Sequence, residues 1–90
     1  MYVQGVDQLP KYQEFIEPML GFLAQQTRPA TNSEINKAVA EALKIPLNLL
    51  NEIHSGSRTE FQYRMAWART KAKADGKISS PERETWVSVR

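Results

Sequence analysis

Residues 59–76 of this 90-residue chain read TEFQYRMAWARTKAKADG, and they decide the fold. Thr59 with Gln62 three residues later matches the capping box that begins many helices, and Gly76 suits the left-handed position that ends one. The stretch therefore predicts a helix of about four turns from Thr59 to Asp75. One line of four side chains falls within about 60° on a helical wheel and forms its predicted buried face: Phe61, Met65, Ala68 and Ala72.

The rest of this helix is strongly basic. Residues 58–73 hold five Lys or Arg and a single acid, Glu60. Four side chains about 90° from the buried line form a predicted basic stripe: Arg58, Gln62, Arg69 and Lys73. A helix face that is only solvated usually mixes both signs of charge, so the stripe indicates a polyanionic ligand. A solvated face without a ligand is the alternative interpretation.

The net charge of +2 says nothing about partners by itself, but its distribution does. Residues 1–54 hold four Lys or Arg and six Asp or Glu, a net −2. Residues 55–90 hold eight and four, a net +4. The C-terminal half therefore presents the positive surface expected of a nucleic-acid site.

A first helix is predicted upstream, because apolar residues recur there every three or four positions. It starts with Pro10 as its first residue. Pro18 should kink or divide it, since proline cannot donate to the carbonyl four residues earlier. The predicted apolar face consists of Tyr12, Phe15, Ile16, Met19, Leu20 and Leu23.

A second helix follows a loop over residues 26–32 that includes a short extended segment. Thr31 and Glu34 match its capping box. Pro46 should end this helix near Lys44 and open a short third helix before a break at residues 55–57. The predicted buried stripe of the second helix is Ile35, Val39, Ala42 and Leu43, and the third helix carries Leu47, Leu50 and Ile53.

Downstream of the long helix, residues 77–79 and 85–89 are short extended runs around a turn-rich link, which predicts a β-hairpin. Helices followed by a small hairpin are the layout of a winged helix-turn-helix. We therefore expect one domain over residues 1–90, of mainly α (α+β) class, with about four helices and a hairpin wing.

In this layout the long helix enters the major groove of double-stranded DNA and the wing touches the backbone. Phosphate contacts supply affinity, and side chains at base edges supply sequence preference. Arginine suits guanine in bidentate fashion, and Gln62 suits adenine. The expected DNA-binding residues are Arg58, Thr59, Gln62, Arg69 and Lys73, with Arg83 in the turn of the wing.

Catalytic and metal sites are not expected. The chain has no cysteine, and its one histidine, His54, lacks a second ligand beside it. Asp75 and Lys77 only superficially resemble the acid-x-Lys pair of metal-dependent nucleases, because Asp75 ends a helix. The sequence holds no glycine-rich phosphate loop and no apolar run long enough for a membrane. We expect no catalytic residue, metal or cofactor, and a cytoplasmic location.

Trp67 and Trp86 are expected to be buried rather than to stack on bases, because large aromatic side chains are more often buried. They would then pack against each other or against the first helix. Tyr12 and Tyr63 are likewise expected to be structural.

Several short motifs resemble the N-terminal domain of Mrr-type restriction proteins, which belong to modification-dependent (type IV) systems. Leu9-Pro10 with Tyr12 is similar to the family's opening L-P-x-Y. Residues 55–61 (SGSRTEF) and 64–70 (RMAWART) are similar to its S-G-x-x-T-x-F and R-x-x-W-A-R-T signature. Residues 76–86 resemble its closing segment, and the order and spacing agree over most of the chain.

The resemblance implies a winged helix that recognises DNA, usually followed by a PD-(D/E)xK nuclease domain in a longer parent protein. It leaves open whether this chain is an excised domain or a standalone relative. It also implies that Arg64 and Trp67 serve the scaffold as much as the ligand. The chain departs from the family at residues 75–77, which read DGK in place of Ala-Gly-Leu, and at Arg83-Glu84 in place of Arg-Gly.

We therefore predict a DNA-binding specificity domain of a restriction-system protein, without catalysis of its own. The sequence leaves open the preferred DNA site, whether a methylated base is read, and whether the protein forms a homodimer. The alternative is a winged-helix module that binds a protein partner, or dimerises, without reading DNA. Salt distinguishes the two, because phosphate binding weakens steeply as salt rises and protein docking need not.

Overall fold

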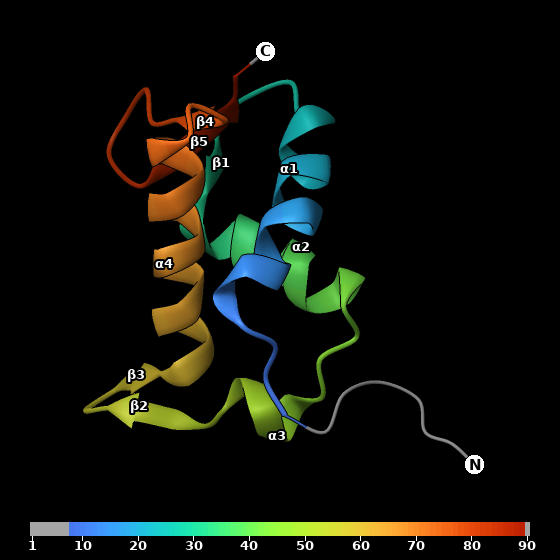
Figure 1. Ribbon diagram of the computed structural model, residues 1–90, viewed down its shortest axis with the longest axis vertical. Coiled ribbons are helices and arrows are strands. Elements are labelled where there is room, and N and C mark those ends of the chain that lie inside the picture. The colour runs from blue at the N-terminus through green and yellow to red at the C-terminus, as the bar shows by residue number, and fades with distance from the viewer. Residues whose placement is uncertain (1–7, 90) are drawn as a thin grey trace.

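Helices make up most of the structure, a computed structural model that describes residues 8–89 (Figure 1). The elements in chain order are a 3-10 helix η1 (Tyr12–Phe15), α1 (Ile16–Ala24), β1 (Ala30–Thr31), α2 (Asn32–Ala42), α3 (Leu47–Leu50), β2 (Ile53–Ser55), β3 (Arg58–Thr59), α4 (Glu60–Ala74), β4 (Ile78–Ser79) and β5 (Thr85–Ser88). Helices followed by a small antiparallel hairpin confirm the predicted α+β winged-helix fold.

The predicted wing is the antiparallel hairpin of β4 and β5, in which Ile78 pairs with Ser88. β5 also pairs with β1, so the order in this sheet is β1-β5-β4. Two hydrogen bonds tie the wing to the start of α2. The Asn32 N–H donates to the Glu84 carbonyl over 3.2 Å, and the Trp86 indole Nε1–H donates to Asn32 Oδ1 over 2.7 Å. The position of the wing is therefore fixed by the helical part of the domain.

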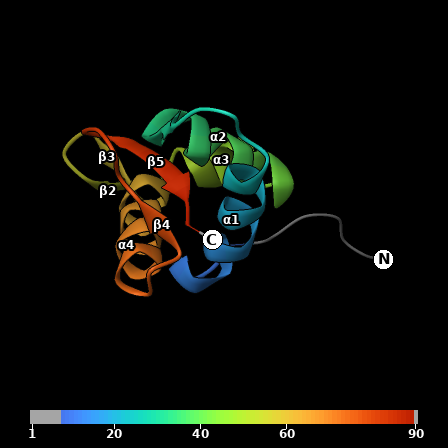
Figure 2. The ribbon, with the colours of Figure 1, turned by 90° about the horizontal axis from the view of Figure 1, so that it is seen from above.

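The core lies between α1, α2 and α4, which surround it in the view from above (Figure 2). Phe15 meets Phe61 edge-on, with ring centroids 5.3 Å apart. The predicted buried line of α4 is confirmed, because each of its four residues is at most 5% exposed. The buried stripe of α2 is narrower than predicted, since Ala42 is exposed. The largest fully buried side chains are Phe15, Met19, Ile35, Met65, Ile78 and Val39.

Pro18 lies within a divided helix, as predicted, but the division falls at Phe15, ahead of the proline. η1 has 3-10 geometry, and α1 continues from it as an α-helix. Pro18 has no N–H to give to the Glu14 carbonyl, which accounts for the change of geometry in the turn before it. The helical segment also begins later than predicted. Lys11 is its N-cap, so Pro10 lies outside it.

The segment between α2 and α4 differs most from the prediction. Ile53, expected on the third helix, lies in β2 and is 64% exposed, while Leu49 is the buried residue of α3. Pro46 is the N-cap of α3 rather than its first helical residue. β2 pairs with β3 across Gly56, whose φ of 54° suits glycine. The sequence indicated only a break here, and the structure has a second hairpin.

Candidate nucleic-acid interface

α4 stands between two hairpins. β2 and β3 lead into its N-terminal end, and β4 and β5 follow its C-terminal end. The turns of both hairpins project beyond the same side of α4 in the two views (Figure 1, Figure 2). We call the exposed side of α4 together with residues 55–58 and 80–84 the α4 face.

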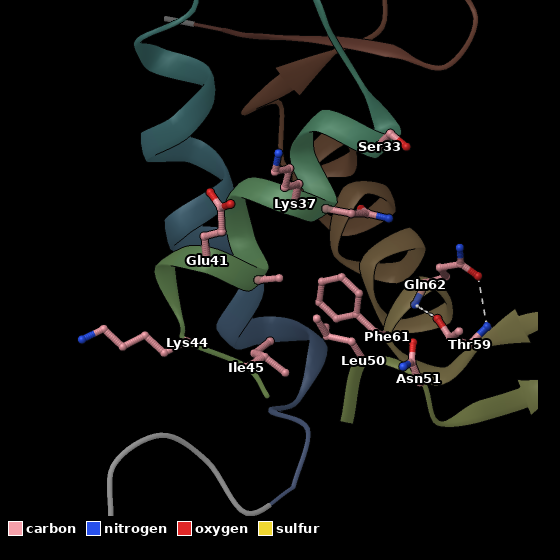
Figure 3. Close-up of a pocket in the computed structure, with 12 residues that line it drawn as sticks. Ser33, Lys37, Glu41, Lys44, Ile45, Leu50, Asn51, Thr59, Phe61 and Gln62 are labelled. Carbon is pink, nitrogen blue, oxygen red and sulfur yellow. Dashed lines mark hydrogen bonds between the residues drawn. The ribbon is translucent and has the colours of Figure 1, made fainter. Parts of the chain in front are cut away.

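The start of α4 has the predicted capping box. The Gln62 N–H donates to Thr59 Oγ1 over 3.1 Å, and the Thr59 N–H donates to Gln62 Oε1 over 3.0 Å (Figure 3). Gln62 Oε1 is therefore already engaged, and its Nε2 group is the part available to a ligand. A bidentate contact with adenine needs the amide oxygen and nitrogen together, so this contact would require the capping box to open. The far end of α4 is also as predicted, with Gly76 at a φ of 76°.

Arg69 is buried, with 8% of its surface exposed. Its Nη1 donates to Asn36 Oδ1 of α2 over 2.8 Å. Burial lowers the pKa of Arg69 below its ordinary value, the positive charge of Arg58 lowers it further, and the negative charge of Glu84 raises it. Arg69 thus lies at the contact of α4 with α2, not on the open part of the predicted stripe. Its role in DNA binding stays a prediction.

The other predicted basic residues are exposed. Arg58 lies in β3, before α4, and its guanidinium carbon is 5.6 Å from the centroid of the Tyr63 ring. Lys73 is exposed in the last turn of α4, and Arg83 is exposed in the turn of the wing. These three cations therefore lie at separate places on the α4 face: Arg58 before α4, Lys73 in its last turn and Arg83 in the turn of the wing.

Arg64 serves the scaffold, as the resemblance implied. Its Nη1 donates to the carbonyls of Leu9 and Pro10, each over 3.0 Å, and its Nε donates to Glu60 Oε2 over 2.8 Å. Hydrogen bonds from Arg64 and then from His54 lower the pKa of Glu60. The acid at the start of α4 is therefore ionised and already paired.

An aromatic cluster lies beside the start of α4. Trp67 is 48% exposed, so its predicted burial is wrong. It does pack near the first helical segment, with its ring centroid 6.3 Å from that of Tyr12 and 6.5 Å from that of Tyr63. His54 stacks on Tyr63 at 3.9 Å. Trp86 is half-buried, so it is less buried than predicted.

The sequence analysis missed a groove of about 560 Å³ between α2, α3 and the start of α4 (Figure 3). α2 contributes Lys37 and Glu41, and α4 contributes Phe61 and Gln62. Its lining comes from segments far apart in the sequence, so no local sequence pattern could indicate the groove. The charged side chains of its lining are Lys37, Glu41 and Lys44, so the groove carries a net charge of only +1.

Over residues 8–89, no three His, Cys, Asp or Glu side chains gather in a group able to hold a metal ion. Within the same range, every helix is too short or too polar to cross a membrane.

Comparison with known proteins places the domain. Residues 12–87 match the Mrr N-terminal domain family. A relative is the type IV methyl-directed restriction enzyme EcoKMrr of Escherichia coli (strain K12), which is 28% identical over 78 residues. The aligned part covers 87% of this chain and 26% of the relative, so the chain spans about a quarter of that protein's length. No solved structure matches. Because the family match extends from η1 into β5, the chain belongs to the Mrr N-terminal domain family.

Proposed function

We propose that this domain binds double-stranded DNA, with α4 in the major groove and the β4–β5 wing on the sugar-phosphate backbone. α4 has 15 residues, which at about 1.5 Å per residue gives roughly 22 Å of helix. A winged helix uses one helix and its wing in this way, and the wing here follows directly after α4.

The proposal rests mainly on which charged side chains of the α4 face form ion pairs within the domain and which do not. The acids of α4 are engaged within the domain: Glu60 pairs with Arg64 at 2.8 Å, and Asp75 lies 3.5 Å from Lys71. In contrast, no carboxylate of residues 8–89 forms an ion pair with Arg58, Lys73 or Arg83. Glu82 and Glu84, in residues 80–84, also lie outside these ion pairs. The α4 face therefore holds three unpaired cations against two unpaired acids, a small positive excess that favours a polyanion.

The proposed contacts differ in kind. Lys73 and Arg83 would bind phosphates, and Arg58 would reach the backbone or a base edge beside the first turn of α4. The Thr59 hydroxyl can donate to a phosphate while its oxygen still caps the helix. Gln62 would donate through Nε2. Arg69 would act through the guanidinium hydrogens that Asn36 does not bind.

We further propose that the domain provides target recognition within a restriction system. The name of EcoKMrr describes a methyl-directed restriction enzyme, and this chain matches about a quarter of it. In the longer protein, cleavage would belong to another domain, and a methylated duplex is the natural ligand to test. A methyl group on a base in the major groove is read through apolar contact.

The exposed Trp67 favours a second candidate function, docking of a protein partner or of a second copy on the aromatic cluster.

Fluorescence anisotropy with labelled duplexes distinguishes DNA binding from protein docking. We expect the logarithm of the association constant to fall linearly with the logarithm of salt concentration, with a slope of about −0.9 per phosphate contacted. Matched methylated and unmethylated duplexes test modification preference. Absence of binding at low salt, or binding indifferent to salt, would overturn the DNA proposal.

A further inference from the structure

We propose that the β2–β3 hairpin is a second clamp on DNA, whose turn contacts the sugar-phosphate backbone across the major groove from the β4–β5 wing. This inference rests on the proposed function, because it assumes that α4 lies in the groove. It assigns a role to residues 55–58, which the sequence analysis treated as a break before the long helix.

The positions of the two hairpins relative to α4 are the first argument. One is joined to each end of a helix of roughly 22 Å, and both turns project on the same side (Figure 1). The major groove is about 12 Å wide and is bordered by one backbone on each side. If the side on which both turns project faces the DNA and the helix axis crosses the groove at an angle, the helix is longer than the groove is wide, and the turn at each end lies near one backbone.

The exposure of the hairpin is the second argument. All residues from Ile53 to Arg58 are exposed, so the hairpin adds little to the core. A helix-turn-helix needs only about three or four residues between its two helices. Here α3 ends at Leu50 and α4 begins at Glu60, and the hairpin fills most of the nine residues between them. A projecting hairpin at this point is explained by a surface contact better than by packing.

The chemistry of the turn fits a phosphate. Residues 53–59 read IHSGSRT and contain no acid. Ser55 and Ser57 offer exposed hydroxyls, Gly56 has no side chain to hold a backbone away, and Arg58 has its charge free of any ion pair within residues 8–89. Hydroxyls and an arginine are typical donors to DNA phosphates.

The hairpin is also held in place before any ligand arrives. The Glu60 N–H donates to the Glu52 carbonyl over 2.8 Å, which closes the base of the hairpin. His54 stacks on Tyr63 at 3.9 Å, and its Nδ1 lies 2.8 Å from Glu60 Oε1. Since the hairpin is fixed to the first turns of α4, less conformational entropy would be lost when it meets a phosphate.

A pair of opposite charge changes tests the clamp. We expect Ser57→Lys to tighten duplex binding and to steepen the salt slope by about 0.9, the value for one added phosphate contact. Ser57→Asp should weaken binding at least about threefold at low salt. Gln25→Lys and Gln25→Asp, at the exposed end of α1, are matched controls and should change affinity less than about twofold. Circular dichroism melts confirm that each variant folds.

Phosphate-ethylation interference locates the contacts. We expect two groups of phosphates whose ethylation interferes with binding, and Arg58→Ala should weaken the interference at one group and Arg83→Ala at the other. If the domain binds DNA but the Ser57 and Gln25 variants behave alike, or a single group of phosphates appears, the clamp is wrong and the proposed function stands. If the unchanged domain does not bind DNA at all, both fail.

Discussion

Arg69 Nη1 donates a hydrogen bond to Asn36 Oδ1 over 2.8 Å, and this bond joins α4 to α2 inside the domain. The partner of this buried cation is a neutral amide, which accepts a hydrogen bond from the guanidinium but does not neutralise its charge. Burial and the positive charge of Arg58 both lower the pKa of Arg69, which is the expected response of a cation held in this environment. A charged side chain that the sequence analysis assigned to DNA thus joins α4 to α2 inside the domain.

Removing the Asn36 acceptor should lower the free energy of unfolding more than removing the Arg69 cation does. We expect Asn36→Ala to lower the free energy of unfolding by about 1–3 kcal/mol, because it leaves a buried charge without its acceptor. Arg69→Met should cost less, since it removes the charge and keeps an unbranched stem in the same space. Urea unfolding measures both. A larger loss for Arg69→Met than for Asn36→Ala would contradict this account of the contact.

The exposed lysine and arginine of the α4 face should act through salt-dependent phosphate contacts. We expect Lys73→Gln and Arg83→Gln each to weaken duplex binding for every sequence tested and to reduce the salt slope by about 1. Lys44→Gln is the matched control, because Lys44 is exposed at the end of α2. Anisotropy titrations at several salt concentrations give the slopes. Equal effects of all three changes would show that only net charge matters.

Thr59 combines a helix cap with a proposed contact, and two substitutions separate these roles. Thr59→Ala removes the cap and should lower the free energy of unfolding by about 1 kcal/mol. Thr59→Asp keeps a capping oxygen and should retain stability, but its negative charge should weaken DNA binding. Thr31→Asp is the matched control, since Thr31 caps α2 in the same way and lies outside the α4 face, so this change should leave DNA binding unaltered. If Thr59→Asp bound DNA as tightly as the unchanged domain, Thr59 would lie outside the interface.

Local patterns were sufficient to predict where α2 begins and where α4 begins and ends. A capping box involves residues three positions apart, so Thr31 with Glu34 and Thr59 with Gln62 could be recognised from the sequence alone. Gly76 as the residue after α4 could be recognised for the same reason.

Errors arose where distant segments decide the outcome. The spacing of Ile53 after Leu50 matched a helix, but pairing of Ile53 with Thr59 drew it into a strand. A helical wheel places Arg69 beside the buried line without indicating that Asn36 of another helix meets it there. The exposure of Trp67 likewise depends on how much of the ring Tyr12 covers. Such contacts follow from the packing of the whole domain and not from the spacing of residues in one element.

The last prediction concerns how the stability of the domain changes at acidic pH. Glu34 accepts a hydrogen bond from Arg28 Nη2 and one from the Thr31 N–H, each over 2.9 Å, and these lower its pKa to about 2 from an ordinary 4.5. Because the folded pKa is depressed, its contribution to stability is present above pH 4.5 and is lost as the pH falls toward 2. Glu34→Gln keeps a capping side chain but not the ion pair. We expect its melting temperature to be below that of the unchanged domain at pH 6 and the difference to shrink toward pH 2. Glu17→Gln, an exposed change in α1, should show no such convergence, and a constant difference for Glu34→Gln across this range would contradict the assigned role of the carboxylate.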